Sequence, residues 1–517
     1  FASCYKLEYI ESDNAYYLGN ADNPYLLLME IKDTGIENYI INRSTRFIGD
    51  YAISGCSNLK NVTIHNNVNG IGFGAFSGCD GLAYNEYDNA YYLGNADNPY
   101  LVLVVAKSND ITSCKINEKT KFIYDNAFEN CDSLISVEIP DGVTNIGSYA
   151  FNDCTSLATV SIPTSVKSIG DKAFENCDNL LRVNITDISA WCKTSFIFGN
   201  CNPLMCGADL YLNGEAVTNL VIPDGVTDIK MFAFYGYKNL TSVTIPNSVV
   251  SIGMSAFSEC DGLTNASIGN GVMYIGFGAF YDCSNLVNVT IGNSVMYIDN
   301  DAFCDCNLSS VTIPSSVKRI GGEAFWCNVL AEVHIEDIKA WCGISFYYSE
   351  GMRSGSNPLQ GGADLYLNGT LVTNLVIPDG ITSIGDYAFY GSNLNSVVLP
   401  NGVTSIGDWA FFGCTSLTSI TIPNTVASIG VSAFNNCYHL AEVYNLSSLN
   451  ITKGSEDNGY VGYYALDIYT DKDAPSKLTR EGDFIVHTDG NVKTLVGYFG
   501  DKAEITIPDN VNGIKNY

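Results

Sequence analysis

The dipeptide Ala-Phe recurs along this chain at nearly constant intervals, and this feature restricts the fold more than any other. Most intervals between successive pairs are 22 or 23 residues, and the exceptions are 52, 60 and 64 residues. A unit this short cannot bury its own apolar face, so successive units must stack and bury that face against one another. The alanines of these pairs, with Ala52-Ile53 as a variant, are Ala75, Ala127, Ala150, Ala173, Ala233, Ala256, Ala279, Ala302, Ala324, Ala388, Ala410 and Ala433.

One repeat unit, here called a rung, runs from Val143 to Pro163. The apolar residues of its second half, Leu157, Val160 and Ile162, finish with an alternating spacing, which predicts a short strand with one buried face. The proline that follows has no N–H to donate and should end the strand pairing. The first half of the rung has a looser apolar spacing, which predicts a turn or a short helix. Glycine follows the isoleucine of this half in ten rungs, which favours a left-handed backbone there without requiring one. The predicted fold class is α/β: a leucine-rich-repeat solenoid with a parallel β-sheet on one face, irregular turns or short helices on the other, and inserted β-hairpins.

The segment of residues 417–437, one repeat long, carries a specific resemblance. Its sequence is Leu-Thr-Ser-Ile-Thr-Ile-Pro-Asn-Thr-Val-Ala-Ser-Ile-Gly-Val-Ser-Ala-Phe-Asn-Asn-Cys. It resembles the BspA-type leucine-rich repeat, a family of bacterial and protozoan surface proteins, and the resemblance covers about 13 rungs. It implies an extracellular protein that adheres to host proteins or to other cells.

The long intervals contain inserted modules near residues 8–40, 83–110, 186–219, 336–374 and 445–500. The first two share a Tyr-Tyr-Leu segment and predict β-hairpins. The next two share Trp-Cys; an Asp-led stretch predicts a short capped helix, and a later Asn-Gly predicts a hairpin. The fifth predicts another hairpin around Phe484. We expect residues 1–517 to form one continuous solenoid, and we expect the chain to be a fragment because it begins and ends at the same phase of the repeat.

Twelve of the 18 cysteines occupy one slot of the rung. Tyr237 and Ser392 replace cysteine in that slot, which argues against a metal site and predicts a ladder of small buried thiols. Cys201 and Cys206 lie outside the slot and are both absent from the second Trp-Cys module, so a local disulfide and two independent thiols are both open. The slot cysteines are Cys4, Cys56, Cys79, Cys131, Cys154, Cys177, Cys260, Cys283, Cys306, Cys327, Cys414 and Cys437.

The charge balance and the motif content exclude several functions. The chain has 55 acidic and 26 basic residues, a net charge of −29 that repels nucleic acid. Its apolar runs are too short for membrane insertion in this segment. The four histidines are scattered and no hydrolase or nucleotide-binding motif is present, so we predict no enzyme, no catalytic residue and no cofactor. We predict no metal site: the Asp and Asn residues of the first two hairpins could offer oxygen to calcium, but they are also ordinary turn formers.

Candidate binding residues are of two kinds. Small hydroxyl side chains between the buried positions of the strands should point outward and form a polar face; they include Thr244, Thr290 and Thr312. Aromatic side chains of the inserted modules are the second kind, because Tyr and Trp dominate interface hot spots, although they could equally pack onto the solenoid. They are Tyr16, Tyr17, Tyr25, Tyr91, Tyr92, Tyr100, Trp191 and Trp341.

These observations predict a non-catalytic cell-surface adhesion protein that recognises host or microbial proteins or glycans, with its signal and anchor outside this fragment. One alternative is a structural stalk or a scaffold that self-associates. Another is the repeat region of a larger protein whose enzymatic domain lies elsewhere.

Overall fold

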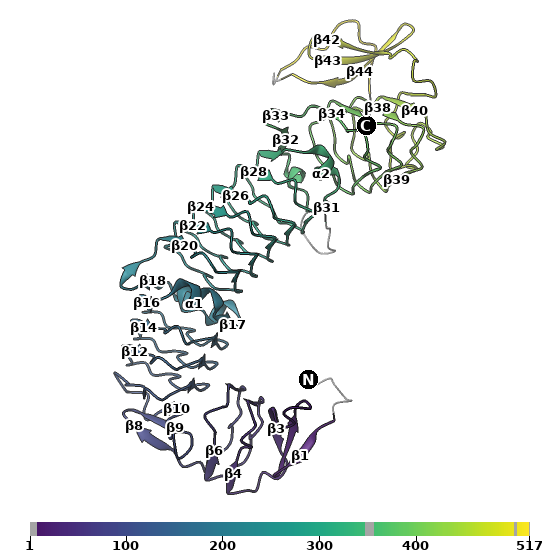
Figure 1. The fold of residues 1–517 in the computed structure, drawn as a ribbon. Coiled ribbons are helices and arrows are strands. Elements are labelled where there is room, and N and C mark those ends of the chain that lie inside the picture. The colour runs from purple at the N-terminus through teal and green to yellow at the C-terminus, as the bar shows by residue number, and fades with distance from the viewer. Residues whose placement is uncertain (1–7, 347–355, 501–503, 516–517) are drawn as a thin grey trace. The chain divides into compact units, whose positions relative to one another are not determined.

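The computed structural model describes residues 8–346, 356–500 and 504–515 (Figure 1). Cys4 and part of the second Trp-Cys module therefore lie outside the described residues. The chain divides into two compact units: Phe1–Thr241 with Ser255–Gly262, and Ser242–Met254 with Leu263–Tyr517. The continuity of the solenoid from end to end stays a prediction.

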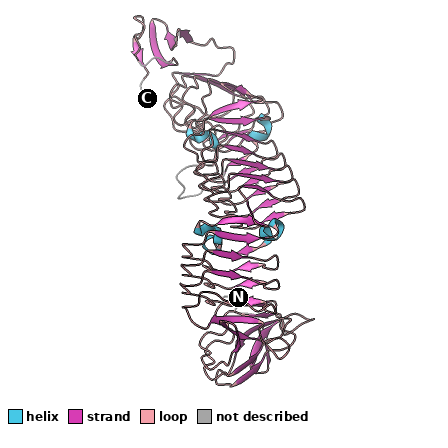
Figure 2. Ribbon diagram, turned by 90° about the vertical axis from the view of Figure 1, so that its left-hand side faces the viewer, coloured by secondary structure: helices cyan, strands magenta, loops and turns pink. Residues whose placement is uncertain are grey.

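Each rung contributes a strand to a front sheet, and most rungs add a second strand of two residues, here called the return strand. Figure 2 looks onto the front strands, which stack side by side in each unit. In the first unit the strands of the front sheet are β12 (Ser136–Glu138), β14 (Thr159–Ser161), β16 (Arg182–Ile185), β18 (Asp209–Leu212) and β19 (Glu215–Ala216). Its return strands are β11 (Phe122–Ile123), β13 (Asn145–Ile146), β15 (Ser168–Ile169) and β17 (Ser195–Phe196), which extend the antiparallel strands β8 (Asn85–Tyr87), β9 (Ala90–Leu93) and β10 (Val102–Ala106).

The first unit also contains strands before β8 and further helices and strands between and after the two sheets just described. The sheet β1–β2–β3–β5–β7 and the pair β4–β6 comprise β1 (Ile10–Ser12), β2 (Ala15–Leu18), β3 (Leu27–Ile31), β4 (Asn38–Ile40), β5 (Phe47–Ile48), β6 (Asn61–Thr63) and β7 (Gly70–Ile71). The remaining elements are β20 (Asn219–Val221), β21 (Asp228–Ile229), helix α1 (Ile188–Lys193) and the 3₁₀ turns η1 (Gly199–Cys201) and η2 (Pro203–Cys206).

The second unit repeats this plan. Its front strands are β22 (Ser242–Ile245), β24 (Asn265–Ile268) and β26 (Asn288–Thr290); β28 (Ser310–Ile313), β30 (Glu332–Ile335), β32 (Asp364–Leu367) and β33 (Thr370–Leu371); and β34 (Asn374–Val376), β36 (Ser396–Val398), β38 (Ser419–Ile422), β40 (Glu442–Asn445) and β41 (Asp467–Tyr469). Its return strands are β23 (Ser251–Ile252), β25 (Tyr274–Ile275), β27 (Tyr297–Ile298), β29 (Arg319–Ile320), β31 (Ser345–Phe346), β35 (Ser383–Ile384), β37 (Ser405–Ile406) and β39 (Ser428–Ile429). A sheet of β42 (Leu478–Glu481), β43 (Phe484–Asp489), β44 (Val492–Tyr498) and β45 (Gly513–Ile514), with helix α2 (Ile338–Cys342) and turn η3 (Pro358–Gly361), completes the unit.

The predicted fold class is confirmed, with one refinement. Stacked parallel strands dominate, and both α-helices of the described residues lie in the Trp-Cys modules. The side opposite the front sheet is more regular than expected, because its two-residue strands also pair in parallel; Asn145 and Ile146, for example, pair with Ser168 and Ile169.

The core of a rung follows the predicted pattern. In the rung that begins at Val143, each residue that the repeat pattern predicts to be buried is at most 4% exposed. These residues are Val143, Ile146, Ala150, Phe151, Cys154, Leu157, Val160 and Ile162. Neighbouring rungs stack their phenylalanine rings: Phe151 lies 5.1 Å from Phe128 and 5.2 Å from Phe174, ring centre to ring centre, and the ring planes in both pairs are nearly parallel. Each rung is therefore held mainly by the two rungs beside it.

The glycine that follows the return-strand isoleucine has a different role from the one predicted. Its backbone is not left-handed; instead, a Cβ on Gly147 would lie 2.6 Å from the backbone nitrogen of Asp125, and one on Gly430 would lie 2.5 Å from that of Asp408. At Gly147 and Gly430 the adjacent rung approaches too closely for a side chain. The left-handed positions lie elsewhere, directly before the rung alanine and directly before the slot cysteine, as at Tyr149 (φ 58°) and Asp153 (φ 57°).

The inserted modules contain the local structures that their sequences predict. Asp187 caps α1 by accepting a hydrogen bond from the Ser189 N–H at 2.7 Å. Asn213 and Gly214 have positive φ angles of 51° and 91° and turn β18 back into β19. The Tyr-Tyr-Leu segment at residues 91–93 lies in β9, which pairs antiparallel with β10. Strand β43 pairs antiparallel with β44.

Candidate functional site

The predicted hydroxyl face exists. Thr244, Thr290 and Thr312 all have exposed side chains on front strands, whereas the neighbouring Val243, Val311 and Ile313 point into the core. Thr244 is in register with Ser267, and Ser267 with Thr290, so hydroxyls line up across three strands. Thr312 is in register with a histidine, His334, and not with another hydroxyl side chain. A binding role for the threonines stays a prediction.

Four of the eight candidate aromatic residues are core residues, which corrects their assignment as ligand contacts. Tyr17, Tyr92, Trp191 and Trp341 are at most 2% exposed. The physical reason in the hairpins is alternation: adjacent tyrosines on one strand face opposite sides, so one of each pair must enter the core.

The other four candidate aromatics are half-buried. Tyr16 lies beneath the Lys32 ammonium, 5.5 Å from ring centre to nitrogen, and Tyr91 lies beneath Lys107 at 5.7 Å. Tyr25 and Tyr100 pack edge-on against the buried tyrosines Tyr17 and Tyr92, at ring distances of 5.4 and 5.6 Å. Their role in recognition stays a prediction.

The side chains of Trp191 and Trp341 form hydrogen bonds to the next rung, which the sequence did not predict. In an ordinary rung the phenylalanine N–H donates to the alanine carbonyl of the next rung, as Phe389 does to Ala410 at 2.8 Å. In the modules the indole Nε1 does this instead: Trp191 donates to Ala233 at 2.7 Å and Trp341 to Ala388 at 2.8 Å. Each Trp-Cys module is thus one modified rung that keeps the connection to the next.

The predicted ladder of buried thiols is present in the described residues. None of the described slot cysteines forms a disulfide, and all but Cys327 are buried. The thiols are also donors: Cys154 donates to the Phe128 carbonyl and Cys177 to the Phe151 carbonyl, both at 3.1 Å. Burial raises the pKa of Cys131 to about 11, so these thiols stay protonated and chemically unreactive.

Of the two alternatives left open for Cys201 and Cys206, the structure has the two independent thiols. Cys206 donates to the Phe174 carbonyl at 3.0 Å, the same contact that the slot cysteines make with the preceding rung. Cys201 donates to the Phe198 carbonyl at 2.6 Å. The two sulfurs therefore serve different carbonyl groups, and Cys206 is a further member of the ladder.

The turn interpretation of the Asp/Asn clusters agrees with their hydrogen bonds. Asn20 Oδ1 accepts from the N–H groups of Asp22 and Asn23, and Asn95 Oδ1 accepts in the same way from Asp97 and Asn98. These amide side chains close the hairpin loops locally.

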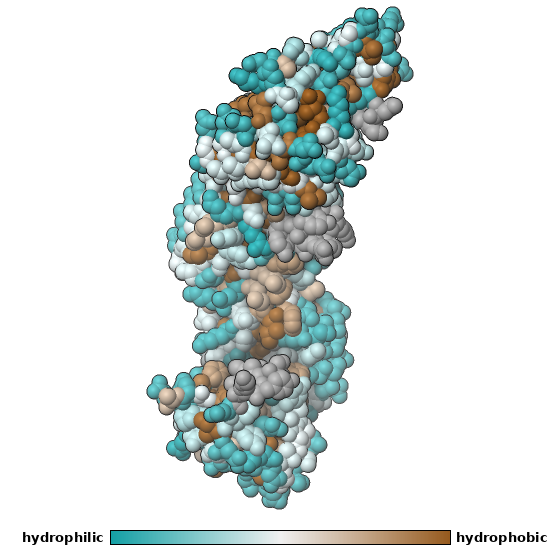
Figure 3. All heavy atoms as spheres, turned by 90° about the vertical axis from the view of Figure 1, so that its right-hand side faces the viewer, coloured by the Kyte–Doolittle hydropathy of each residue, from teal (hydrophilic) through white to brown (hydrophobic). Residues whose placement is uncertain are grey.

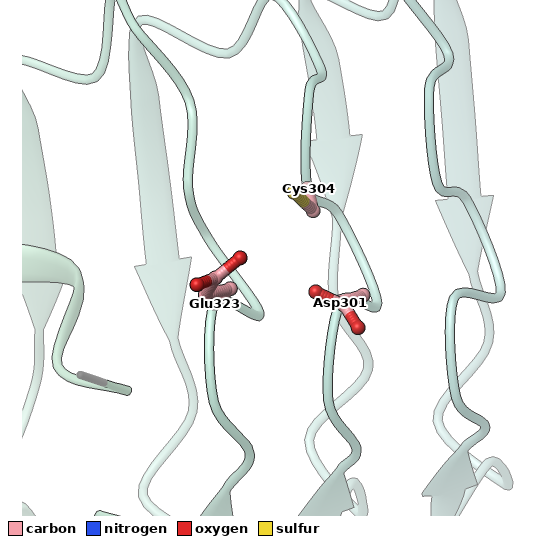
Figure 4. A group of neighbouring side chains, drawn as sticks. All are labelled: Asp301, Cys304 and Glu323. Carbon is pink, nitrogen blue, oxygen red and sulfur yellow. The ribbon is translucent and has the colours of Figure 1, made fainter. Parts of the chain in front are cut away.

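A group that sequence reasoning missed could hold a metal ion. Ligand atoms of Asp301, Cys304 and Glu323 lie within 4.8 Å of one another. Figure 4 shows that Asp301 and Cys304 belong to one rung and Glu323 to the next. Burial, followed by the carboxylates of Glu323 and Asp305, raises the pKa of Asp301. The signal in the sequence is that Asp301 and Glu323 both precede the rung alanine, since residues in one slot of adjacent rungs are neighbours.

Three front sheets end in a set of four outward side chains, here called a terminal quartet. Each quartet occupies alternate positions of the last two parallel strands. The register pairs the first residue of one strand with the aspartate of the next and the third residue with a tyrosine. The first quartet is Arg182, Asn184, Asp209 and Tyr211; the second is Glu332, His334, Asp364 and Tyr366; the third is Glu442, Tyr444, Asp467 and Tyr469.

The third quartet binds a segment of the same chain. Ser476 Oγ donates to Glu442 Oε2 and the Lys477 N–H donates to Glu442 Oε1, both at 2.7 Å. The Lys477 ammonium lies 3.0 Å from Asp467 Oδ2, and His487 Nε2 lies 2.7 Å from the same oxygen. Burial by itself would raise the pKa of Asp467, but the hydrogen bonds from Lys477, His487 and Lys453 lower it to about 2.

Acid is expected to loosen the β42–β44 hairpin through Asp467. The pKa of this carboxyl is about 2 in the folded chain against an ordinary 3.8, so its contacts stabilise the docked hairpin fully above about pH 3.8 and are lost as the pH falls towards 2. The loss should reach about 2 kcal/mol. Hydrogen exchange of the hairpin amides, corrected for intrinsic rates, would measure it. Asp467→Asn should remove this pH dependence, and the exposed Asp473→Asn should keep it; an unchanged profile in Asp467→Asn would contradict the assignment.

The side of the return strands has a different character. Figure 3 views this side and shows hydrophobic residues among polar ones. In the second unit the exposed apolar side chains there include Met273, Tyr274, Phe277 and Tyr297, each 38–43% exposed. None of the helices in the described residues is long and apolar enough to span a membrane.

Several solved structures are similar to this chain. A leucine-rich repeat protein from Bacteroides ovatus is 23% identical, with a TM-score of 0.45, covering 70% of this chain and 92% of that one. A leucine-rich cell surface protein from Faecalibacterium prausnitzii is 23% identical (TM-score 0.31), covering 76% and 96%. The pneumococcal vaccine antigen PcpA is 19% identical (TM-score 0.29), covering 70% and 81%. No curated protein matches the chain.

The match to a family model extends over most of the sequence. The BspA type leucine rich repeat region matches in six copies, over residues 31–95, 106–204, 206–331 and 362–456. These stretches contain the stacked rungs, with their buried phenylalanines and thiols. The chain belongs to the BspA-type leucine-rich repeat family.

Proposed function

We propose that this chain is a non-catalytic, extracellular binding segment of a cell-surface protein, which adheres to host or microbial proteins or glycans through the outward face of its front sheets. The observation that carries the proposal is the register of that face. Thr244, Ser267 and Thr290 stand in line on adjacent strands, so side chains of one slot form a continuous polar row. A rigid row of this kind offers many weak contacts without requiring the core to change.

Binding to this surface carries a reduced entropic cost in its side chains. Its outward side chains are short and sit on paired strands, so little side-chain entropy is lost when a partner covers them. The net charge of −29 favours partners with basic patches and disfavours nucleic acid. Membership of the BspA-type family supports the surface location and the adhesive role.

The test is binding to an immobilised panel of matrix proteins and glycans, with variants that place bulky charge on the polar row. Thr244→Arg and Thr290→Arg together should weaken binding about tenfold or more, since they obstruct the centre of the proposed interface. Ser345→Arg, an exposed position on return strand β31, is the matched control and should bind normally.

Two outcomes would contradict the proposal. If nothing on the panel binds and light scattering shows oligomers that grow with concentration, the chain is a self-associating scaffold. If the Ser345 variant loses binding and the threonine variants do not, the return side is the interface. The complete reading frame would show whether a catalytic domain accompanies the repeats.

A further inference from the structure

The third terminal quartet shows which ligand this arrangement takes. Its occupant is an extended peptide, residues 476–478, at the start of β42. The occupant offers a hydroxyl and a backbone N–H to the glutamate and an ammonium group to the aspartate. The Tyr469 hydroxyl lies within hydrogen-bond distance of both acids, 3.3 Å from Glu442 Oε1 and 3.3 Å from Asp467 Oδ2. Beneath this occupant Glu442 is completely buried.

The second quartet repeats the third in sequence and in register. Glu332-Val-His334 corresponds to Glu442-Val-Tyr444, and Asp364-Leu-Tyr366 corresponds to Asp467-Ile-Tyr469. In each case the glutamate pairs across the sheet with the aspartate. The aromatic floor is also present: His334 stacks on Tyr366 with ring centres 4.8 Å apart, and Tyr444 lies 4.8 Å from Tyr469.

The second quartet differs from the third in having no peptide across it in the described part of the chain. The Glu332 side chain is 45% exposed, and its ion-pair partner is His334 of the same strand, with Nε2 3.0 Å from Oε2. Asp364 accepts a hydrogen bond from the Asn393 amide at 3.0 Å. Neither carboxylate forms an ion pair with a lysine or arginine among the described residues. Glu332 is therefore partly open to solvent and is paired across the sheet with the half-buried Asp364.

The first quartet explains why the second is the one available to a partner. Arg182 replaces the glutamate there and places its guanidinium 3.9 Å from the Tyr211 ring centre. The first quartet thus already contains a cation of its own on the tyrosine face. The first quartet contains a cation of its own, Arg182, and the third binds Lys477 from a later segment. The second quartet has two acids and no lysine or arginine paired with them among the described residues.

We propose that Glu332, Asp364 and Tyr366 bind a lysine side chain of an extended segment in a partner protein, with a small hydroxylated residue directly before the lysine. The proposal rests on the proposed binding function and names the class of partner. The lysine ammonium bonds to Asp364, as Lys477 bonds to Asp467, and the preceding hydroxyl and the lysine N–H bond to Glu332, as in the third quartet. Such charge-assisted bonds are strong and directional.

A synthetic peptide with the sequence of residues 474–480, Ala-Pro-Ser-Lys-Leu-Thr-Arg, tests this on the full chain by saturation-transfer NMR. Millimolar peptide is appropriate, because the natural contact forms within one chain at an effective concentration of that order. Saturable binding is expected. It should weaken about tenfold or more when the peptide lysine is replaced by glutamine, or when the chain carries Glu332→Gln with Asp364→Asn. The peptide variant leaves the protein unaltered, so misfolding cannot mimic the result.

Matched variants distinguish the quartets. Asp209→Asn alters the first quartet and should leave peptide binding unchanged. Binding that depends on Asp467 and not on Glu332 and Asp364 would overturn the proposal, because the peptide would then occupy the third quartet. Oligomers abolished by Glu332→Gln with Asp364→Asn, without peptide binding, would overturn it in favour of a second copy of the chain. A chain that binds the matrix panel but not the peptide refutes this inference alone; one that binds the peptide but nothing on the panel refutes the adhesive function alone.

Discussion

Replacing Phe151 by alanine is expected to lower the free energy of unfolding by about 3–5 kcal/mol. Phe151 is fully buried, and its ring lies between Phe128 and Phe174 at distances of 5.1 and 5.2 Å. The cavity would remove ring contacts on both sides. A rung is held by its neighbours, so those neighbours cannot collapse into the space without breaking their own strand pairing. Urea unfolding followed by circular dichroism would measure the change.

Leu181→Ala is the matched control for Phe151→Ala. Leu181 is a large apolar residue of the next rung and is 69% exposed, so its truncation should change stability by at most about 0.5 kcal/mol. Equal losses for the two variants would contradict the stacked-rung core. Hydrogen exchange should also show that the loss of protection in Phe151→Ala is greatest in the amides of the rungs on either side.

Replacing Trp341 by alanine should have a comparable effect, about 3–5 kcal/mol, at the junction between a modified rung and an ordinary one. Trp341 is 1% exposed and packs edge-on against Phe346 at 5.3 Å between ring centres. Its indole N–H also donates to the Ala388 carbonyl at 2.8 Å. The alanine variant would lose both the packing and the bond that connects this rung to the next.

Trp341→Phe separates the two contributions. It keeps most of the ring volume but removes the donor, while Asn357 Nδ2 still donates to Ala388 at 3.0 Å. The carbonyl therefore keeps one partner, and the cost should be about 1 kcal/mol. If phenylalanine were as damaging as alanine, the indole N–H would matter more than the packing; if alanine were harmless, Trp341 would not be a core residue.

The rung was predictable because each of its core positions repeats many times. The spacing of Leu157, Val160 and Ile162 indicates which positions of one rung are buried, and the same spacing recurs in the other rungs. Because equivalent positions of stacked rungs contact one another, the repeat pattern also predicts the tertiary contacts. The hairpin tyrosines show where this reasoning stops. The aromatic content of the hairpin predicts both Tyr16 and Tyr17 as binding residues, but strand alternation permits only one of them to face outward, and Tyr17 is completely buried.

The quartets were not predictable from the rung pattern because the modules interrupt it. Glu332 and Asp364 are 32 positions apart, with helix α2 and turn η3 between them, so an alignment of rungs at intervals of 22 or 23 residues does not bring them together. The recurrence of Glu-Val-x and Asp-Leu/Ile-Tyr was the available signal. The group Asp301, Cys304 and Glu323 was missed for another reason: its neighbours lie across rungs, whereas motif searches run along the chain.

The indole donors of the Trp-Cys modules have a consequence for how such a gene can change. A plain rung and a module present the same connection to the rung that follows, since a phenylalanine N–H in one and a tryptophan N–H in the other meet the same alanine carbonyl. Recombination that exchanges one for the other would leave the next rung undisturbed. Each exchange would also end a front sheet at a new place and carry with it the aspartate and tyrosine of a quartet. The spacing of recognition points along the surface could thus be inherited as a rearrangement of whole rungs, without point mutations in the core.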